Sequence, residues 1–143
     1  MKKLSVLICI PVLLVTLVNV IPVFAQTPTI FCNITWGKTA ITGQVYIAGY
    51  LEIKDASGGC LTGIAGQTIY SDYMVKHYNI DGSCGYMSYY GQATTDNQGH
   101  FLIQYGPWWV PKVLGIEVNY YGNGQYSPAN QWSWIDINPA DYC

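Results

Sequence analysis

Apolar and polar residues alternate with a period of two along most of this chain, which is the pattern of β-strands. The alternation is longest from Ile41 to Ile53, where the odd positions are apolar or glycine and most even positions are polar. Turn residues follow at Asp55-Ala56-Ser57-Gly58-Gly59. We expect a long strand here that is bent or divided at Gly49, because an isolated glycine in a strand favours an irregularity.

Further segments have the same period, are separated by turn residues and show no helical period. They are Thr27 to Trp36, Gln67 to Tyr78, Tyr86 to Thr95, Phe101 to Tyr105, Leu114 to Tyr120 and Trp132 to Ile137. A total of about seven short strands without helices indicates an all-β, antiparallel β-sandwich. Parallel strands would need crossover segments, and the connections here are too short or too rich in glycine to supply helices.

Two motifs suggest which kind of sandwich this is. Thr94 to Phe101 reads Thr-x-Asp-x-x-Gly-x-Phe, and Tyr121 to Pro128 reads aromatic-Gly-x-x-x-Tyr-x-Pro. This pair resembles the second half of bacterial and archaeal immunoglobulin-like domains, including the invasin type and the related transthyretin-like modules. The resemblance covers Ile41 to Ile137. It implies an immunoglobulin-like fold that binds, spaces or assembles, although one fold serves many tasks.

The first residues have the features of a secretory signal peptide. Lys2 and Lys3 precede an apolar run from Leu4 to Val23, and Val23-Phe24-Ala25 predicts cleavage before Gln26. An uncleaved membrane anchor is the alternative, because the run approaches the roughly 20 apolar residues that span a bilayer. We therefore expect a signal peptide at residues 1–25, an arm or first strand at 26–38 and one sandwich domain at 39–143, secreted or on the cell surface.

Charge excludes one class of partner. There is no arginine, and without Lys2 and Lys3 the chain has four lysines against eight acidic residues, a formal charge of −4. Such a chain has no basic stripe for nucleic acid, and we expect membrane contact only through an uncleaved signal peptide. Because charged residues are only 10% of the chain, we also expect the fold to depend little on pH.

The cysteines predict disulfides. Cys9 lies in the leader, and an even number in an exported chain remains: Cys32, Cys60, Cys84 and Cys143. Of the three possible connectivities we favour Cys60 with Cys84, closing the loops around one strand, and Cys32 with Cys143, joining the termini. A zinc site is disfavoured, because no cysteine or histidine pair has ligand spacing.

Catalytic motifs are absent from the sequence. There is no nucleophile elbow, phosphate-binding loop or His-Glu-x-x-His pair. His77 and His100 are both expected on sheet surfaces, so we predict no enzyme, no cofactor and no metal. Asp96, Asn97 and Asp136 are interpreted as turn residues rather than calcium ligands, which would need clustered carboxylates.

Four tryptophans are candidates for a ligand or subunit interface: Trp108, Trp109, Trp132 and Trp134. In the last segment the period of two places Ile135 and Ile137 on the face opposite the tryptophans. If the isoleucines face the core, the indoles face outward, where they can stack on sugars or pack against another subunit. A bulge that turns one tryptophan inward is the alternative.

The arm has a strand pattern of its own, with Ile30, Ile34 and Trp36 as candidate donor-strand residues. Such an arm can complete the sheet of a neighbouring subunit. The alternative is an ordinary first strand packed on its own domain. Asn33-Ile34-Thr35 also matches the N-glycosylation acceptor motif, which marks Asn33 as a modification site.

These features predict a non-catalytic, exported sandwich with a structural or assembly role, as a subunit of an extracellular filament or surface layer that pairs with itself. The alternative is an adhesive or carbohydrate-binding module that binds cell-surface glycans or proteins through exposed tryptophans.

Overall fold

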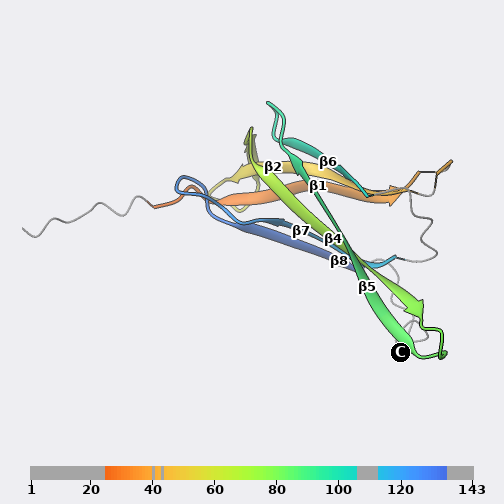
Figure 1. Ribbon diagram of the computed structural model, residues 1–143. Helices are drawn as coiled ribbons and strands as arrows, with labels where there is room; N and C mark the ends of the chain where they lie inside the picture. Colours follow the sequence, from red (N-terminus) through yellow and green to blue (C-terminus); the bar gives the residue numbers. More distant parts are fainter. Residues whose placement is uncertain (1–24, 40, 43, 106–112, 135–143) are drawn as a thin grey trace, which may run out of the picture.

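The computed structural model describes residues 25–39, 41–42, 44–105 and 113–134, without the side chains of 76–78, 113, 114 and 134. This part of the chain has no helix long and apolar enough to cross a bilayer. It forms antiparallel strands (Figure 1): β1 (Thr29–Lys38), β2 (Val45–Lys54), β3 (Cys60–Gly63), β4 (Thr68–Tyr78), β5 (Cys84–Thr94), β6 (His100–Gln104), β7 (Val113–Tyr120) and β8 (Ala129–Trp134).

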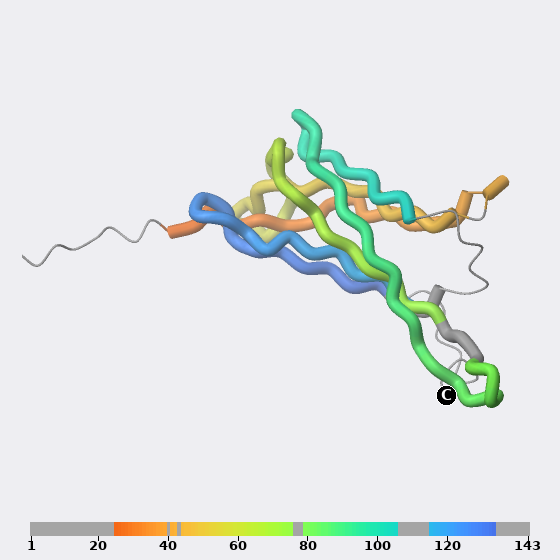
Figure 2. Tube along the Cα trace, in the orientation of Figure 1, coloured from red at the N-terminus to blue at the C-terminus, as the bar shows by residue number. Residues whose placement is uncertain are grey.

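The strands make two sheets, which confirms the predicted all-β sandwich at the level of two antiparallel layers. In the first sheet β1 pairs with β2, and β2 also pairs with β6 and β3. The second sheet has the order β5-β4-β7-β8. The β4–β5 hairpin continues past the last pairing of β4 with β7, so its far end projects beyond the other strands (Figure 2).

The core lies between the sheets and follows the alternation of the sequence. Its most deeply buried side chains come from both sheets and are at most 1% exposed; they include Val45, Ile47, Leu51, Ile69, Tyr73, Ile116 and Val118. The odd positions of β2 therefore face inward as expected.

Gly49 does not divide β2, which is one strand from Val45 to Lys54, so that part of the expectation is wrong. The pairing of β2 with β6 runs through Gly49 without a break. A Cβ atom at Gly49 would instead overlap the side chain of Ile34 on β1. Glycine is needed here because a neighbouring strand fills its place in the core.

A β-bulge in β1 changes which residues of the arm share a face. Asn33 has a φ of 51°, and the register shifts between Cys32 and Thr35; asparagine tolerates this left-handed backbone better than most residues. Ile30 lies opposite Glu52, on the outer side, whereas Trp36 lies opposite Ile47, on the inner face of the sheet, with its side chain 38% exposed. The single face expected for Ile30, Ile34 and Trp36 is therefore split.

The disulfide connectivity also differs from the expectation. Cys32 is bonded to Cys60, with a Cα–Cα distance of 6.3 Å, and Cys84 is disulfide-bonded as well. The predicted pairs Cys60–Cys84 and Cys32–Cys143 are wrong. Disulfides persist in oxidising compartments, which fits the expected extracellular location.

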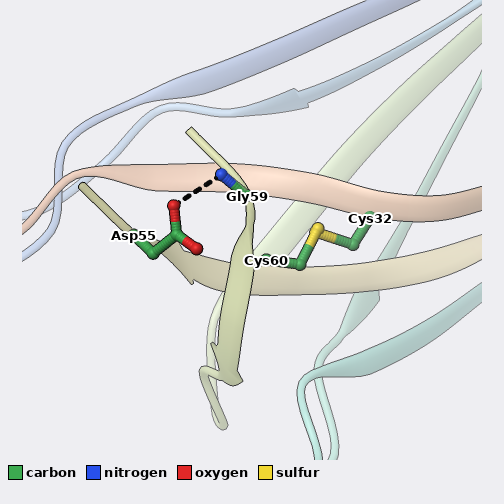
Figure 3. The surroundings of a disulfide bond; sticks show 4 residues. All are labelled: Cys32, Asp55, Gly59 and Cys60. Atoms are coloured by element: carbon green, nitrogen blue, oxygen red, sulfur yellow. Dashed lines mark hydrogen bonds between the residues drawn. A yellow bond between two sulfur atoms is a disulfide. The ribbon is translucent and has the colours of Figure 1, made fainter. Parts of the chain in front are cut away.

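The turn before β3 explains why Cys60 reaches Cys32. The Asp55 carboxylate accepts hydrogen bonds from the backbone N–H groups of Ser57 at 2.8 Å and Gly59 at 2.7 Å. Figure 3 shows the bond to Gly59 and the disulfide beside it. These bonds hold the tight turn that leads into β3, a strand of four residues that the sequence pattern did not reveal.

Candidate functional site

The outer face of the second sheet carries a continuous row of aromatic and acidic side chains. Tyr90 on β5 lies opposite Asp72 on β4, Asp72 lies opposite Glu117 on β7, and Glu117 lies opposite Trp132 on β8. Tyr90 is 79% exposed. Because directly opposed residues share a face, the row crosses all four strands.

A second row runs beside the first, two residues along each strand. It contains Gln92, Tyr70, Asn119 and Asn130, again as direct neighbours. The Asn130 side-chain amide donates to Asn119 Oδ1 at 2.5 Å and to the Glu117 carboxylate. Asn130 therefore orients the Asn119 amide in its own row and the Glu117 carboxylate in the first row. We call the eight residues of the two rows the polar aromatic face.

Two negative charges, on Asp72 and Glu117, repel each other at the centre of the polar aromatic face. Burial raises the pKa of the Asp72 carboxyl above its ordinary value, and the negative charge of Glu117 raises it further. Like charges directly opposite on neighbouring strands are destabilising. Neither row contains a cation that would relieve this repulsion. Perturbed carboxylates of this kind are more frequent at binding and catalytic sites than elsewhere.

The alternation of β8 places Trp132 on this outer face, where its side chain is half-buried. Gln131 is opposite Val118 and Ser133 is opposite Ile116, and both of those partners are in the core. The backbone of Trp134 is opposite Gly115. Ile135 and Ile137, on which the sequence argument depended, lie outside the described residues. So do the other two interface candidates, Trp108 and Trp109.

The remaining members of the two rows were missed by the sequence argument. Alternation places Tyr70 and Asp72 on the outer side of β4, and this much was readable from the sequence. Their neighbours on β7 and β8 depend on strand register, which a period of two does not specify.

The arm is built into its own domain. Thr27 forms a bridge with Tyr126, and the Thr29 hydroxyl donates to the Ser127 carbonyl at 2.7 Å. Phe31 is 6% exposed and packs edge-on against Phe101. Asn33 is exposed at the bulge. The arm of this chain therefore has the contacts of a first strand, and its acceptor asparagine is accessible.

His100 and the loop carboxylates take structural positions. The His100 ring lies 5.1 Å from the Tyr50 ring, and its Nδ1 is 3.8 Å from Asp96 Oδ2. Asp96 Oδ1 accepts the backbone N–H groups of Gln98 and His100, and Gly99 has a φ of 80°. This is the turn that the Thr-x-Asp-x-x-Gly-x-Phe motif specifies. Asp136 lies outside the described residues.

Among the described side chains, a possible metal-ligand group is formed by Cys32, Cys60 and Glu52. Both sulfur atoms belong to the disulfide, whereas a metal would require thiolates. The group therefore offers only one carboxylate in the oxidised protein.

The chain matches no protein-family model, no curated protein and no solved structure.

Proposed function

We propose that this protein is a non-catalytic extracellular module of the immunoglobulin-like type that binds carbohydrate on its polar aromatic face. The observation that carries the proposal is the row Tyr90, Asp72, Glu117 and Trp132, which crosses the whole sheet. Export is supported by the leader sequence and by the Cys32–Cys60 disulfide.

The chemistry of the face suits a glycan. Sugar rings have apolar faces that stack on tyrosine and tryptophan, and their hydroxyl groups donate to carboxylate and amide oxygens. The polar aromatic face offers both kinds of contact next to each other. The open sheet surface also leaves room for an extended chain.

Retention on polysaccharides tests this proposal. The purified oxidised protein should be retained on one or more of a panel of insoluble plant, fungal and bacterial polysaccharides. W132A and Y90A should each weaken retention by up to about tenfold, the value of one lost aromatic contact. L102A is the matched control, because Leu102 is 47% exposed on the outer side of the first sheet. Equal retention of all variants would reject the face as the binding site.

A structural role through self-assembly is a second candidate, favoured by one observation. β8 lies at an edge of the second sheet and carries no charged residue and no proline, which are the usual protections of an edge strand. Light scattering after size exclusion tests it. A ladder of oligomers would support assembly, and a clean monomer would exclude it at the concentration used.

A further inference from the structure

A pocket opens at one end of the polar aromatic face. It has a volume of about 260 Å³ and lies where the start of β4 meets the end of β7. Its lining residues are Gly66, Gln67, Thr68, Tyr70, Tyr120, Tyr121 and Gly122. The rings of Tyr70 and Tyr121 have centroids 5.2 Å apart and planes at 45°, so they form an angled aromatic wall.

The pocket is held in shape before any ligand arrives. Gln67 Oε1 accepts hydrogen bonds from the Tyr120 hydroxyl at 2.8 Å and from the Asn123 amide at 2.9 Å. Its own amide donates to the Ala65 carbonyl at 3.0 Å. One side chain thus ties together the two loops that border the pocket. A site that is already ordered loses less entropy on binding.

Gly122 fixes the second loop in the same way. Its φ is 77°, and a Cβ atom there would come within 2.9 Å of the Pro128 nitrogen and the Tyr126 carbonyl oxygen. The aromatic-Gly-x-x-x-Tyr-x-Pro motif therefore has a local purpose: it folds a tight loop that leaves the Tyr121 ring 71% exposed.

The lining carries no charged side chain. Its free polar groups are hydroxyls, from Thr68 and the two wall tyrosines. A ligand that matches this surface has an apolar face for the rings, hydroxyl groups for the rim and no charge. Asp72, two residues along β4 from Tyr70 and on the same face, would also repel an anionic ligand.

We propose that this pocket is a subsite for a single uncharged sugar ring. The inference rests on the proposed glycan-binding function and names its ligand class. The volume is below the roughly 300 Å³ at which pockets for drug-sized ligands begin, so its size suits one ring rather than several. A proline-rich peptide is the competing occupant of an aromatic site, but it requires an extended groove rather than one short, partly open pocket.

Nuclear magnetic resonance of the ¹⁵N-labelled, oxidised protein tests the subsite. We expect the methyl glycosides of glucose, galactose, mannose or N-acetylglucosamine to shift the Gly66 and Gly122 amide signals, and glucuronate to shift them far less. Y121A should weaken this binding about tenfold, as for one lost stacking contact. Y121F, which keeps the ring, should retain most of it, and L102A should bind as the unaltered protein does.

Several outcomes would overturn the subsite. They are no shift with any neutral glycoside, equal binding of glucuronate, equal binding by Y121A, or a stronger shift of the same signals by an oligoproline peptide. Retention on polysaccharide, measured in parallel, separates the two proposals. If the protein is retained on polysaccharide but no glycoside shifts the Gly66 and Gly122 signals, only the subsite proposal fails. If there is neither retention nor a shift, the proposed glycan-binding function fails as well.

Discussion

Removal of the Cys32–Cys60 bridge should cost a large part of the stability of this small domain. The bonded residues are 28 apart in sequence. In the chain-entropy account, closing a loop of that length destabilises the unfolded state by about 3.5 kcal/mol. The Cα–Cα distance of 6.3 Å is usual for a bridge, so we expect most of that value to be realised. A typical domain has a total stability of about 5–15 kcal/mol.

Two variants separate the bridge from the packing of its sulfur atoms. Cys60 is exposed, so C60S removes the bond and leaves the buried Cys32 thiol in place. C32A/C60S removes the buried sulfur as well. Equilibrium unfolding in guanidinium chloride, followed by tryptophan fluorescence, should give C60S a loss of about 3–4 kcal/mol. The double variant should lose somewhat more, because Cys32 is only 3% exposed and its sulfur leaves a small cavity.

Either of two results would contradict the predicted role of the Cys32–Cys60 disulfide. A loss below about 1 kcal/mol in C60S would mean that the bridge does not constrain the unfolded chain. Peptide mapping of the oxidised protein by mass spectrometry should find the Cys32 peptide joined to the Cys60 peptide, and a Cys60–Cys84 product would refute the connectivity itself.

Three further predictions concern the fold and its charges. G63A should destabilise strongly, because a Cβ there would overlap the backbone of Gln98, whereas G124A has open space and should be nearly neutral; thermal unfolding compares them. Burial raises the pKa of Tyr73 to about 12 from 10.0; the folded state then holds the phenol proton more tightly, so stability should fall as pH rises from about 10 through 12. Y73F should reduce this alkaline loss and cost little at pH 7, because the buried Tyr73 hydroxyl has no hydrogen-bond partner among the described residues; an unchanged alkaline titration curve would contradict this. D72N should raise stability at pH 7 by roughly 0.2–1 kcal/mol by ending repulsion with Glu117. Since the Asp72 pKa is raised, protonation relieves that repulsion as pH falls, and urea midpoints should show the D72N gain vanishing near pH 3.

Alternation along the sequence was enough to predict the strands other than β3, the two-layer architecture and the inward residues of β2. Alternation did not predict features that depend on contacts between strands. The bulge at Asn33 reverses the faces of β1, and the reason for Gly49 is the Ile34 side chain across the strand pair. β3 has only four residues, too few for a periodic signal.

The candidate site was only partly predictable for the same reason. An outer position for Trp132 was one of two alternatives that the sequence left open, and strand pairing decides it. Its row required three strand registers, which join residues as distant as Asp72 and Glu117. Tyr121 stood within a recognised motif, but its exposure against Tyr70 depends on how two loops meet.

The position of the disulfide has a consequence for the order in which an exported chain matures. The bridge joins β1 to β3, and β1, β2 and β3 follow one another in the sequence. A chain that crosses a membrane with its N-terminus first exposes Cys32 and Cys60 to oxidation before Cys84 emerges. β1, β2 and β3 can therefore close and lock during translocation, and this timing alone disfavours the mispairing of Cys60 with Cys84. In an exported chain the disulfide would therefore join β1 to β3 before all strands of the second sheet had emerged.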